Sequence, residues 1–289
     1  MANRTLARLK TEMIFNQDLA RLVDVMKGIA AAQYHVMDRK RAHLERYGKA
    51  VEELFDVYDF RLSDHPFIRS DDARHKLICL VTTDSGFLGG LNMKVVQAGF
   101  KQEEKGTQYA VVGERGVNYV REFGRTYTAF PGINPDESRF ELVERLASHI
   151  ADAVLGGQFG KAIIVYPYSI SFTAQRVEVL NLIPCPIFFK NRSMAAPTDE
   201  VQAREVILES SPSQAVEFLT GLWLRKRLAE VFESAKLSEY GARTMHLEES
   251  YQTLSKLNKQ LKLEFFKARR EKIDQSLRES FTSQLMCES

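Results

Sequence analysis

Apolar side chains recur at helical spacing through both ends of the chain. In the first arm they follow one another mostly at steps of three and four residues, at Leu6, Leu9, Met13, Ala20, Val23, Met26, Ala30, Met37, Leu44, Tyr47, Val51, Leu54 and Tyr58. Polar Asn16 and Gln33 interrupt this stripe. The last arm repeats the pattern at Leu247, Tyr251, Leu254, Leu257, Leu261, Phe265, Ala268, Ile273, Leu277, Phe281 and Leu285. Both stripes predict long amphipathic helices with the seam of a coiled coil.

The helix-breaking residues avoid both arms. All eight prolines lie between residues 66 and 212, and a proline inside a helix costs about 3 kcal/mol. Ser211 is the expected cap of the last helix, with Pro212 in its first turn. A helix from Ser213 to Leu285 would be roughly 110 Å long at 1.5 Å per residue, whereas a domain of about 140 residues is only ~30–40 Å across. The other arm is the available partner, so we predict an antiparallel coiled coil; the alternative is two helices lying on a globular core.

The middle of the chain alternates between two kinds of segment. Continuous apolar runs at 76–82, 108–113 and 161–166 are typical of buried strands, and helical patterns occupy 91–102, 117–123 and 138–154. A further strand pair is expected at 177–182 and 185–189, while the first helix should end between residues 59 and 65, ahead of Pro66. This rhythm predicts an α/β fold with βαβ units. The expected division is a coiled-coil helix at 1–62, a central Rossmann-like domain at 74–205 and a coiled-coil helix at 211–287.

A glycine-rich turn follows the first predicted strand. Its characteristic residues are Asp84, Gly86, Gly89, Gly90 and Asn92. A loop of this kind before a helix can cradle a phosphate. The G-x-x-G-G spacing, however, matches neither the dinucleotide fingerprint nor the P-loop. We therefore interpret the loop as a structural turn that needs positive φ and close packing.

Composition excludes several classes of function. The hydrophobic share of 44%, the charged share of 27% and the net charge of +2 describe an ordinary soluble protein without the basic excess of a nucleic-acid binder. The three cysteines are far apart, and neither they nor the histidines have metal-ligand spacing, so we expect free thiols in a reducing compartment. No apolar run is long enough to span a membrane. We found no catalytic or cofactor motif, and therefore predict a chain without a catalytic, cofactor or metal site.

Four segments of the chain match the sequence motifs of one protein family. Residues 25–33 read VMKGIAAAQ, which is similar to the family's A-M-x-x-V-A-A-A-K. Residues 83–92 read TDSGFLGGLN, which is similar to S-D-R-G-L-C-G-G-L-N. In the last arm, residues 238–243 read SEYGAR, against S-E-x-x-A-R, and residues 265–277 read FFKARREKIDQSL, against Y-N-x-x-R-Q-x-x-I-T-x-E-L. The segments keep the family's order along essentially the whole chain, and together they resemble the gamma subunit of the rotary F-type ATP synthases.

This resemblance implies both a fold and a function. The two arms would form the central-stalk rotor inside a ring of alternating alpha and beta subunits. The central domain would lie near the epsilon subunit and the membrane c-ring. Such a rotor couples transmembrane proton or sodium flow to ATP synthesis or hydrolysis without a catalytic site of its own. The expected location is the cytoplasmic face of the bacterial inner membrane, as a peripheral protein.

The resemblance also assigns roles to individual residues. Met26 and Arg243 match the family's coupling Met and Arg, one in each arm. Arg269 matches the Arg that contacts a catch loop on the beta subunit.

The same segment departs from the family where its Gln, Thr and Glu are replaced. Arg270, Asp274 and Ser276 stand at these positions, and Arg270 and Asp274 have the i,i+4 spacing of a helix-face ion pair. We interpret the chain as a divergent gamma subunit from an alternative bacterial F-type ATPase, with proton or sodium as the coupling ion. Two other classes remain open at this point: a nucleotide-binding α/β protein, and a coiled-coil adaptor with no rotary role.

Overall fold

A computed structural model describes residues 6–53, 65–69, 74–134, 138–189 and 211–287. The chain forms two compact units. One contains residues 1–31 together with 244–289, and the other contains residues 32–243. Two long helices, α1 (Leu6–Glu53) and α5 (Pro212–Cys287), contribute to both.

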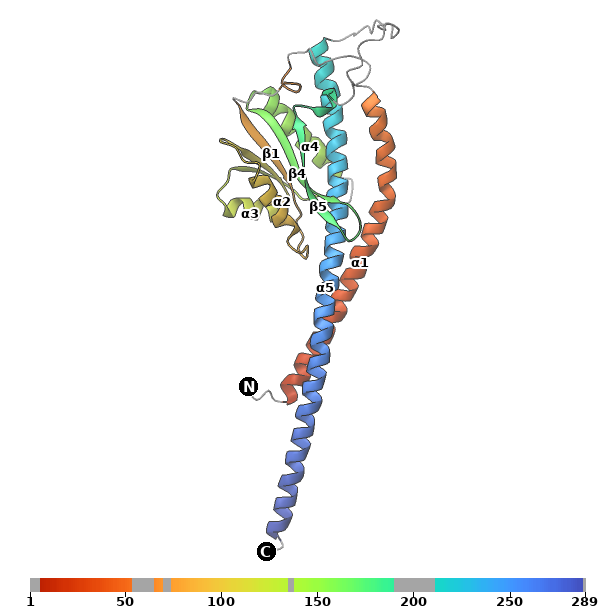
Figure 1. Cartoon of the computed structure of the whole chain (residues 1–289), viewed down its shortest axis with the longest axis vertical. Helices are drawn as coiled ribbons and strands as arrows, with labels where there is room; N and C mark the ends of the chain where they lie inside the picture. Colours follow the sequence, from red (N-terminus) through yellow and green to blue (C-terminus); the bar gives the residue numbers. More distant parts are fainter. Residues whose placement is uncertain (1–5, 54–64, 70–73, 135–137, 190–210, 288–289) are drawn as a thin grey trace. The chain divides into compact units, whose positions relative to one another are not determined.

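The larger unit contains a five-stranded sheet in the order β3-β2-β1-β4-β5 (Figure 1). Its strands are β1 (His75–Val81), β2 (Gln108–Val112), β3 (Tyr127–Phe130), β4 (Phe159–Ser169) and β5 (Gln175–Ile183). The first four run parallel, and β5 returns antiparallel to β4 as a hairpin. The connecting helices are α2 (Leu91–Phe100), α3 (Glu114–Glu122) and α4 (Ser138–Leu155).

Both faces of the sheet are covered by helices. Along β1, Leu77, Cys79 and Val81 belong to a core shared with α4 and the first part of α5. The alternate residues Ile78 and Leu80 belong to a second core shared with α2 and α3. A parallel sheet buried on both faces has continuous apolar strands, which is why the runs at 76–82, 108–113 and 161–166 were recognisable. The predicted α/β class and its βαβ units are confirmed.

Two of the predicted details of the sheet need correction. Residues 185–189 are not a strand; Pro186–Phe189 forms a short 3-10 helix instead. The chain leaves the ladder here because Pro186 has no N–H to donate and the N–H of Cys185 donates to the Phe67 carbonyl at 2.7 Å. The edge strand β3 was missed because it is only four residues long and two of them are exposed.

The start of α5 agrees with the sequence prediction. The N–H of Gln214 donates to Ser211 Oγ, and the N–H of Ser211 donates to Gln214 Oε1, both at 3.3 Å. These reciprocal bonds form a capping box, and Pro212 occupies the first helical position, where a missing N–H costs nothing. The predicted end of the first helix, at residues 59–65, lies almost entirely outside the described residues.

In the smaller unit α1 and α5 pair as an antiparallel coiled coil. Asn16 on α1 contacts Leu254 on α5, whereas the later residue Lys27 contacts the earlier residue Glu248. On each helix a series of buried or half-buried positions recurs at steps of three and four, at 6, 9, 13, 16, 20, 23, 27 and 30 on α1 and at 244, 247, 251, 254, 258, 261, 265 and 268 on α5. The predicted pairing of the arms is therefore confirmed for this part of the chain.

Three details of the predicted seam are wrong. Asn16 does not interrupt the seam; it is 5% exposed and belongs to it. Asn258 occupies the seam position that was assigned to Leu257, which is 42% exposed, because the regular alternation selects 258. The seam also ends earlier than the apolar stripe does. Leu261 is buried, whereas the stripe residues Ile273, Leu277 and Phe281 are exposed.

Candidate functional site

A polar contact joins the two helices beside Met26. Lys27 Nζ lies 2.7 Å from Asp24 Oδ1 and 2.9 Å from Glu248 Oε2 on the opposite helix. It also lies 4.8 Å from the ring centroid of Tyr251. The hydrogen bonds that Lys27 donates to the Asp24 and Glu248 carboxylates raise the pKa of Lys27. The bond from Lys27 is also the main cause that lowers the pKa of Glu248. Sequence reasoning missed this contact, although position 27 continues the spacing of 20, 23 and 30.

Met26 itself is half-buried at the border of the seam. The α1 side chains around it form an exposed apolar strip, with Leu22 56%, Val25 60% and Ile29 54% exposed. Their spacing of three and four residues places them on one helix face. Contiguous exposed apolar side chains of this kind mark interaction surfaces. Met26 therefore lies between the seam and a surface suited to another protein.

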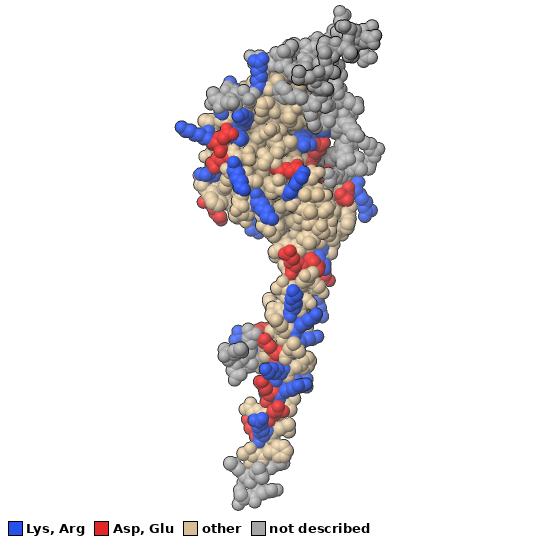
Figure 2. Space-filling view, viewed as in Figure 1, with Lys and Arg blue, Asp and Glu red and all other residues tan. Residues whose placement is uncertain are grey.

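The end of α5 beyond Leu261 carries four of the predicted residues. Arg269, Arg270, Asp274 and Ser276 are all exposed and follow one another on this helix. Large apolar side chains are exposed on the same segment: Leu263, Phe266, Ile273, Leu277 and Phe281, at 50–71%. Figure 2 shows basic and acidic side chains interspersed along it. Their spacing places these five residues on one face of the helix, and an exposed apolar face of this kind marks an interaction surface.

The i,i+4 ion pair that the spacing of Arg270 and Asp274 allows is not observed. In the part of the chain that the structure describes, Arg270 and Asp274 make no salt bridge with each other. Their charged groups therefore stay available for a partner. The roles of these residues remain predictions.

Arg243 lies in the larger unit and is held by its neighbours on α5. Its Nη2 donates to Glu239 Oε1 at 2.5 Å, and its guanidinium carbon lies 6.0 Å from the centroid of the Tyr240 ring. The Arg243 side chain is 14% exposed and that of Glu239 only 4%. Glu239 also accepts a hydrogen bond from Lys236 Nζ at 2.8 Å. Arg243 and Met26 belong to different compact units.

The segment 238–243 of α5 contacts the end of β4 and the β4–β5 turn. Ser238 Oγ donates to the Pro167 carbonyl on β4 at 3.1 Å. Tyr240 packs with Tyr34 and Met37 of α1 and with Phe172 of the β4–β5 turn. A Cβ on Gly241 would lie 2.8 Å from the Phe172 carbonyl oxygen, so only glycine allows this close approach. The resemblance to S-E-x-x-A-R thus coincides with a dense set of contacts.

The glycine turn contacts the same part of α5. Leu88 and Leu91 pack against Ala242. Gly89 and Gly90 have φ of 56° and 85°, a conformation that glycine adopts without the strain of a side chain. Gly86 has no positive φ, and a Cβ there would lie 3.3 Å from Arg115 Nη2.

Polar side chains at the turn bond within the chain. Asn92 Nδ2 donates to Thr83 Oγ1 at 3.0 Å. Asp84 Oδ1 accepts the N–H of Glu114, the first residue of α3, at 2.8 Å. The next two amides of α3 donate to the Thr83 carbonyl and to Thr82 Oγ1. The helix N-terminus that holds a phosphate in nucleotide-binding folds is thus occupied at α3 by the chain's own oxygens.

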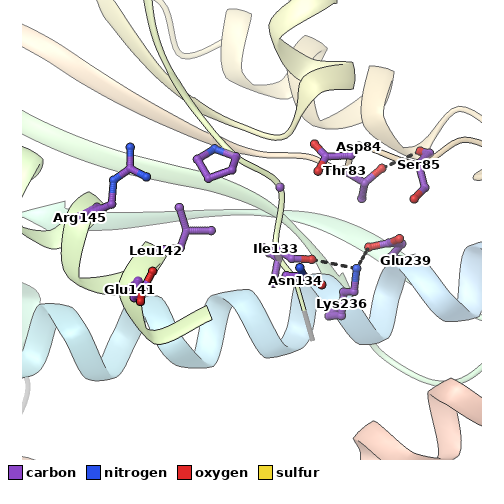
Figure 3. Close-up of a pocket in the computed structure, with 12 residues that line it drawn as sticks. Thr83, Asp84, Ser85, Ile133, Asn134, Glu141, Leu142, Arg145, Lys236 and Glu239 are labelled. Carbon is purple, nitrogen blue, oxygen red and sulfur yellow. Dashed lines mark hydrogen bonds and ion pairs between the residues drawn. The ribbon is translucent and has the colours of Figure 1, made fainter. Parts of the chain in front are cut away.

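A cavity of about 450 Å³ opens at the carboxyl ends of β1 and β3 (Figure 3). Its charged lining comes from three elements and has both signs: Asp84 after β1, Glu141 and Arg145 on α4, and Lys236 and Glu239 on α5. Among the described residues, no group of three or more His, Cys, Asp and Glu side chains has the arrangement of a metal site. None of the helices within the described ranges is long and apolar enough to cross a membrane.

Comparisons with known proteins agree along nearly the whole chain. A family model described as ATP synthase matches residues 5–282. The chain is 24% identical to the ATP synthase gamma chain of Halothermothrix orenii, over 95% of this chain and 96% of the relative. It is 22% identical to the ATP synthase gamma chain of Synechococcus sp., over 90% of this chain and 91% of the relative. Among solved structures it resembles a chain of the rotor of the Euglena gracilis mitochondrial ATP synthase, with a TM-score of 0.65 and 18% identity over 93% of this chain and 98% of that one.

Proposed function

From its membership of the gamma-subunit family of ATP synthases, we infer that this chain is the central-stalk rotor subunit of a rotary F-type ATPase. The family match over residues 5–282 is the observation that carries this conclusion. Gamma is a non-catalytic subunit, and ATP chemistry takes place on beta. The chain therefore contributes to ATP synthesis or hydrolysis mechanically.

We assign the partners by surface. The exposed apolar strip on α1 and the end of α5 beyond Leu261 contact the surrounding alpha and beta subunits. The sheet-containing unit contacts the epsilon subunit and the membrane c-ring. One solved relative, from the mitochondrial ATP synthase of Tetrahymena thermophila, belongs to a structure of the central stalk and c-ring. The chain would thus be a peripheral component of a membrane complex, and we propose the cytoplasmic face of the bacterial inner membrane as its location.

The rotor acts as a differential ligand for the catalytic subunits. A ligand shifts a conformational equilibrium only by the difference in its affinity for the two states. Different faces of an asymmetric pair of helices supply that difference to the three beta subunits in turn. Exposed apolar side chains suit such a bearing because their contacts are non-directional. Charged groups that form no salt bridge with another described residue, such as those of Arg270 and Asp274, suit contacts that form and break during rotation.

The coupling residues remain part of this proposal. We assign Met26 a coupling role on the paired helices. Arg243 has the corresponding role in the segment 238–243 of α5. Arg269 contacts a catch loop on beta, with Arg270, Asp274 and Ser276 forming a modified contact beside it. The coupling ion, proton or sodium, depends on the membrane rotor.

Two alternatives are less well supported. A nucleotide-binding α/β protein needs a phosphate site, and the glycine turn before α2 has neither the dinucleotide-binding spacing nor that of a P-loop. A coiled-coil adaptor without a rotary role does not explain why the family match includes the α/β domain.

The experiment is purification of the complex through a tag on this chain, followed by assay in vesicles. We expect alpha and beta subunits to copurify and ATP addition to drive ion uptake. Uptake that responds to Na⁺ identifies sodium as the coupling ion, and uptake that depends only on pH identifies the proton. A complex that lacks alpha and beta would refute the rotor assignment. Tight nucleotide binding by the isolated chain would support the first alternative.

A further inference from the structure

A buried carboxylate on α5 is shared by two cations. Glu239 accepts from Lys236 Nζ on one oxygen, at 2.8 Å, and from Arg243 Nη2 on the other, at 2.5 Å. The side chains of Lys236, Glu239 and Arg243 are only 11%, 4% and 14% exposed. Charge-assisted hydrogen bonds of this kind are stronger and shorter than neutral ones.

The three residues share one face of the helix, at positions i, i+3 and i+7. Lys236 extends the network beyond α5, because its Nζ also donates to the Ile133 carbonyl at 3.0 Å. Ile133 belongs to the connection between β3 and α4. Figure 3 shows the Lys236 ammonium between Ile133 and Glu239. The chain of bonds therefore runs from the β3–α4 connection, through Lys236 and Glu239, to the guanidinium of Arg243.

Packing alone does not fix this network. Lys236 and Glu239 both line the cavity of about 450 Å³, so this side of the two side chains is not filled by neighbouring atoms. Their orientation then depends on the ion pairs. Arg243 has five N–H donors in a rigid plane, and the bond to Glu239 uses one of them while fixing the plane's direction.

We propose that Lys236 is a positioning residue for rotor coupling: it holds Glu239, which in turn orients the Arg243 guanidinium toward its partner subunit. The inference rests on the proposed coupling role of Arg243. Lys236 lies outside the segments that resemble the family. It thus adds a residue to the coupling machinery on structural grounds alone.

The test compares variants of this chain in the assembled, membrane-bound complex. Lys236→Met removes the ammonium and keeps most of the side-chain volume. The matched control is Lys226→Met, because Lys226 is equally buried on α5 and pairs with Glu230, which is likewise shared with an arginine, Arg227. The readout is ion uptake per ATP hydrolysed, together with the thermal midpoint of the complex.

Loss of one charge-assisted hydrogen bond should lower the ratio of correctly oriented to misoriented Arg243 guanidinium groups by about tenfold. We therefore expect K236M to lower uptake per ATP by up to about that factor while ATP hydrolysis continues. Lys236→Arg should restore uptake, because it keeps the charge. Glu239→Gln should reproduce the loss of uptake, since the network acts through this carboxylate. If the K236M complex does not assemble, this variant tests whether the network positions Arg243.

Other results would overturn the proposal. Uptake per ATP in K236M and E239Q equal to that of the parent would show that the network does not position Arg243. An equal loss in K226M would show that any buried ion pair on α5 has this effect. Arg243→Gln distinguishes the role of Lys236 from the role of Arg243 itself. Uncoupling in R243Q with normal coupling in K236M refutes only the role of Lys236, whereas normal coupling in R243Q refutes the role of Arg243 as well.

Discussion

Replacement of Gly241 by alanine tests whether the contact between α5 and the β4–β5 turn is as close as the structure has it. An alanine Cβ at this position would lie 2.8 Å from the carbonyl oxygen of Phe172 and 2.7 Å from Gln175 Nε2. Such separations lie well inside van der Waals contact. The Gln175 amide also donates to the Phe172 carbonyl at 3.1 Å, so it is not free to swing away without loss.

Two effects of opposite sign determine the outcome. In a helix interior, alanine is more favourable than glycine by about 1 kcal/mol. Overpacking against a fixed backbone costs about 1–3 kcal/mol. The net expectation for Gly241→Ala is a loss of about 1 kcal/mol in the free energy of unfolding.

Two other helical glycines serve as controls. At Gly28 a Cβ would meet no atom of the described residues within 4 Å, so Gly28→Ala should raise the free energy of unfolding by about 1 kcal/mol. At Gly221 the one close neighbour among the described residues is Nη1 of Arg225, at 2.8 Å. Arg225 must shift to make room and is held by two hydrogen bonds to Glu144, at 2.6 Å each, so Gly221→Ala should fall between the other two variants.

The assay is urea denaturation of the purified chain, followed by far-UV circular dichroism and by tyrosine and tryptophan fluorescence. The two probes show whether the chain unfolds in one transition. The order of midpoints should be G28A above G221A above G241A. A midpoint of G241A at or above that of G28A would show that the β4–β5 turn can withdraw from α5, and would refute the close approach.

Three further predictions concern other parts of the chain. Arg269→Glu should impair ATP-driven ion uptake or assembly while changing the free energy of unfolding by less than about 0.5 kcal/mol, because the side chain is exposed; normal uptake in this variant would count against a contact with beta. Leu261→Ala should destabilise the chain by about 2–3 kcal/mol in urea denaturation, since Leu261 is 5% exposed, whereas Leu263→Ala, at 71%, should have almost no effect. Burial raises the pKa of Cys79 to about 12. The stability that this neutral thiol contributes should be complete below its unfolded value, near 9, and be lost as the pH rises toward 12; at pH 8 Cys79 should react with a thiol reagent only after denaturant is added.

The sequence was sufficient for the α/β class, the strand runs and the pairing of the arms. Strands such as β1 were recognisable because a sheet covered on both faces leaves no polar alternation. The start of α5 was recognisable because Ser211 and Pro212 satisfy different requirements of a helix N-terminus. These are local signals, and they do not depend on knowing the neighbours in space.

Other features depend on long-range contacts. The role of Lys236 could not be predicted, because its acceptor at Ile133 is 103 residues away. The seam position of Lys27 could not be predicted from apolar spacing, because the residue is charged and its ammonium pairs with Glu248 on the other helix. The apolar stripe of α5 predicts a seam longer than the one observed. The spacing of apolar residues shows which face of a helix is apolar, but it does not show which molecule covers that face. Beyond Leu261, that covering surface belongs to our proposed partners.

Asn16 has a consequence for how a pair of helices carries torque. Two helices with an entirely apolar heptad seam can slide past each other by seven residues and regain equivalent contacts. Each such slip would reduce the rotation that one end of the helix pair transmits to the other. Asn16 is buried at 5% exposure, and its Nδ2 donates to the Leu254 carbonyl at 3.2 Å. A slip would leave this amide buried without its acceptor, which costs about 1–3 kcal/mol. A single polar residue thus opposes slippage under load and keeps the two helices turning as one body.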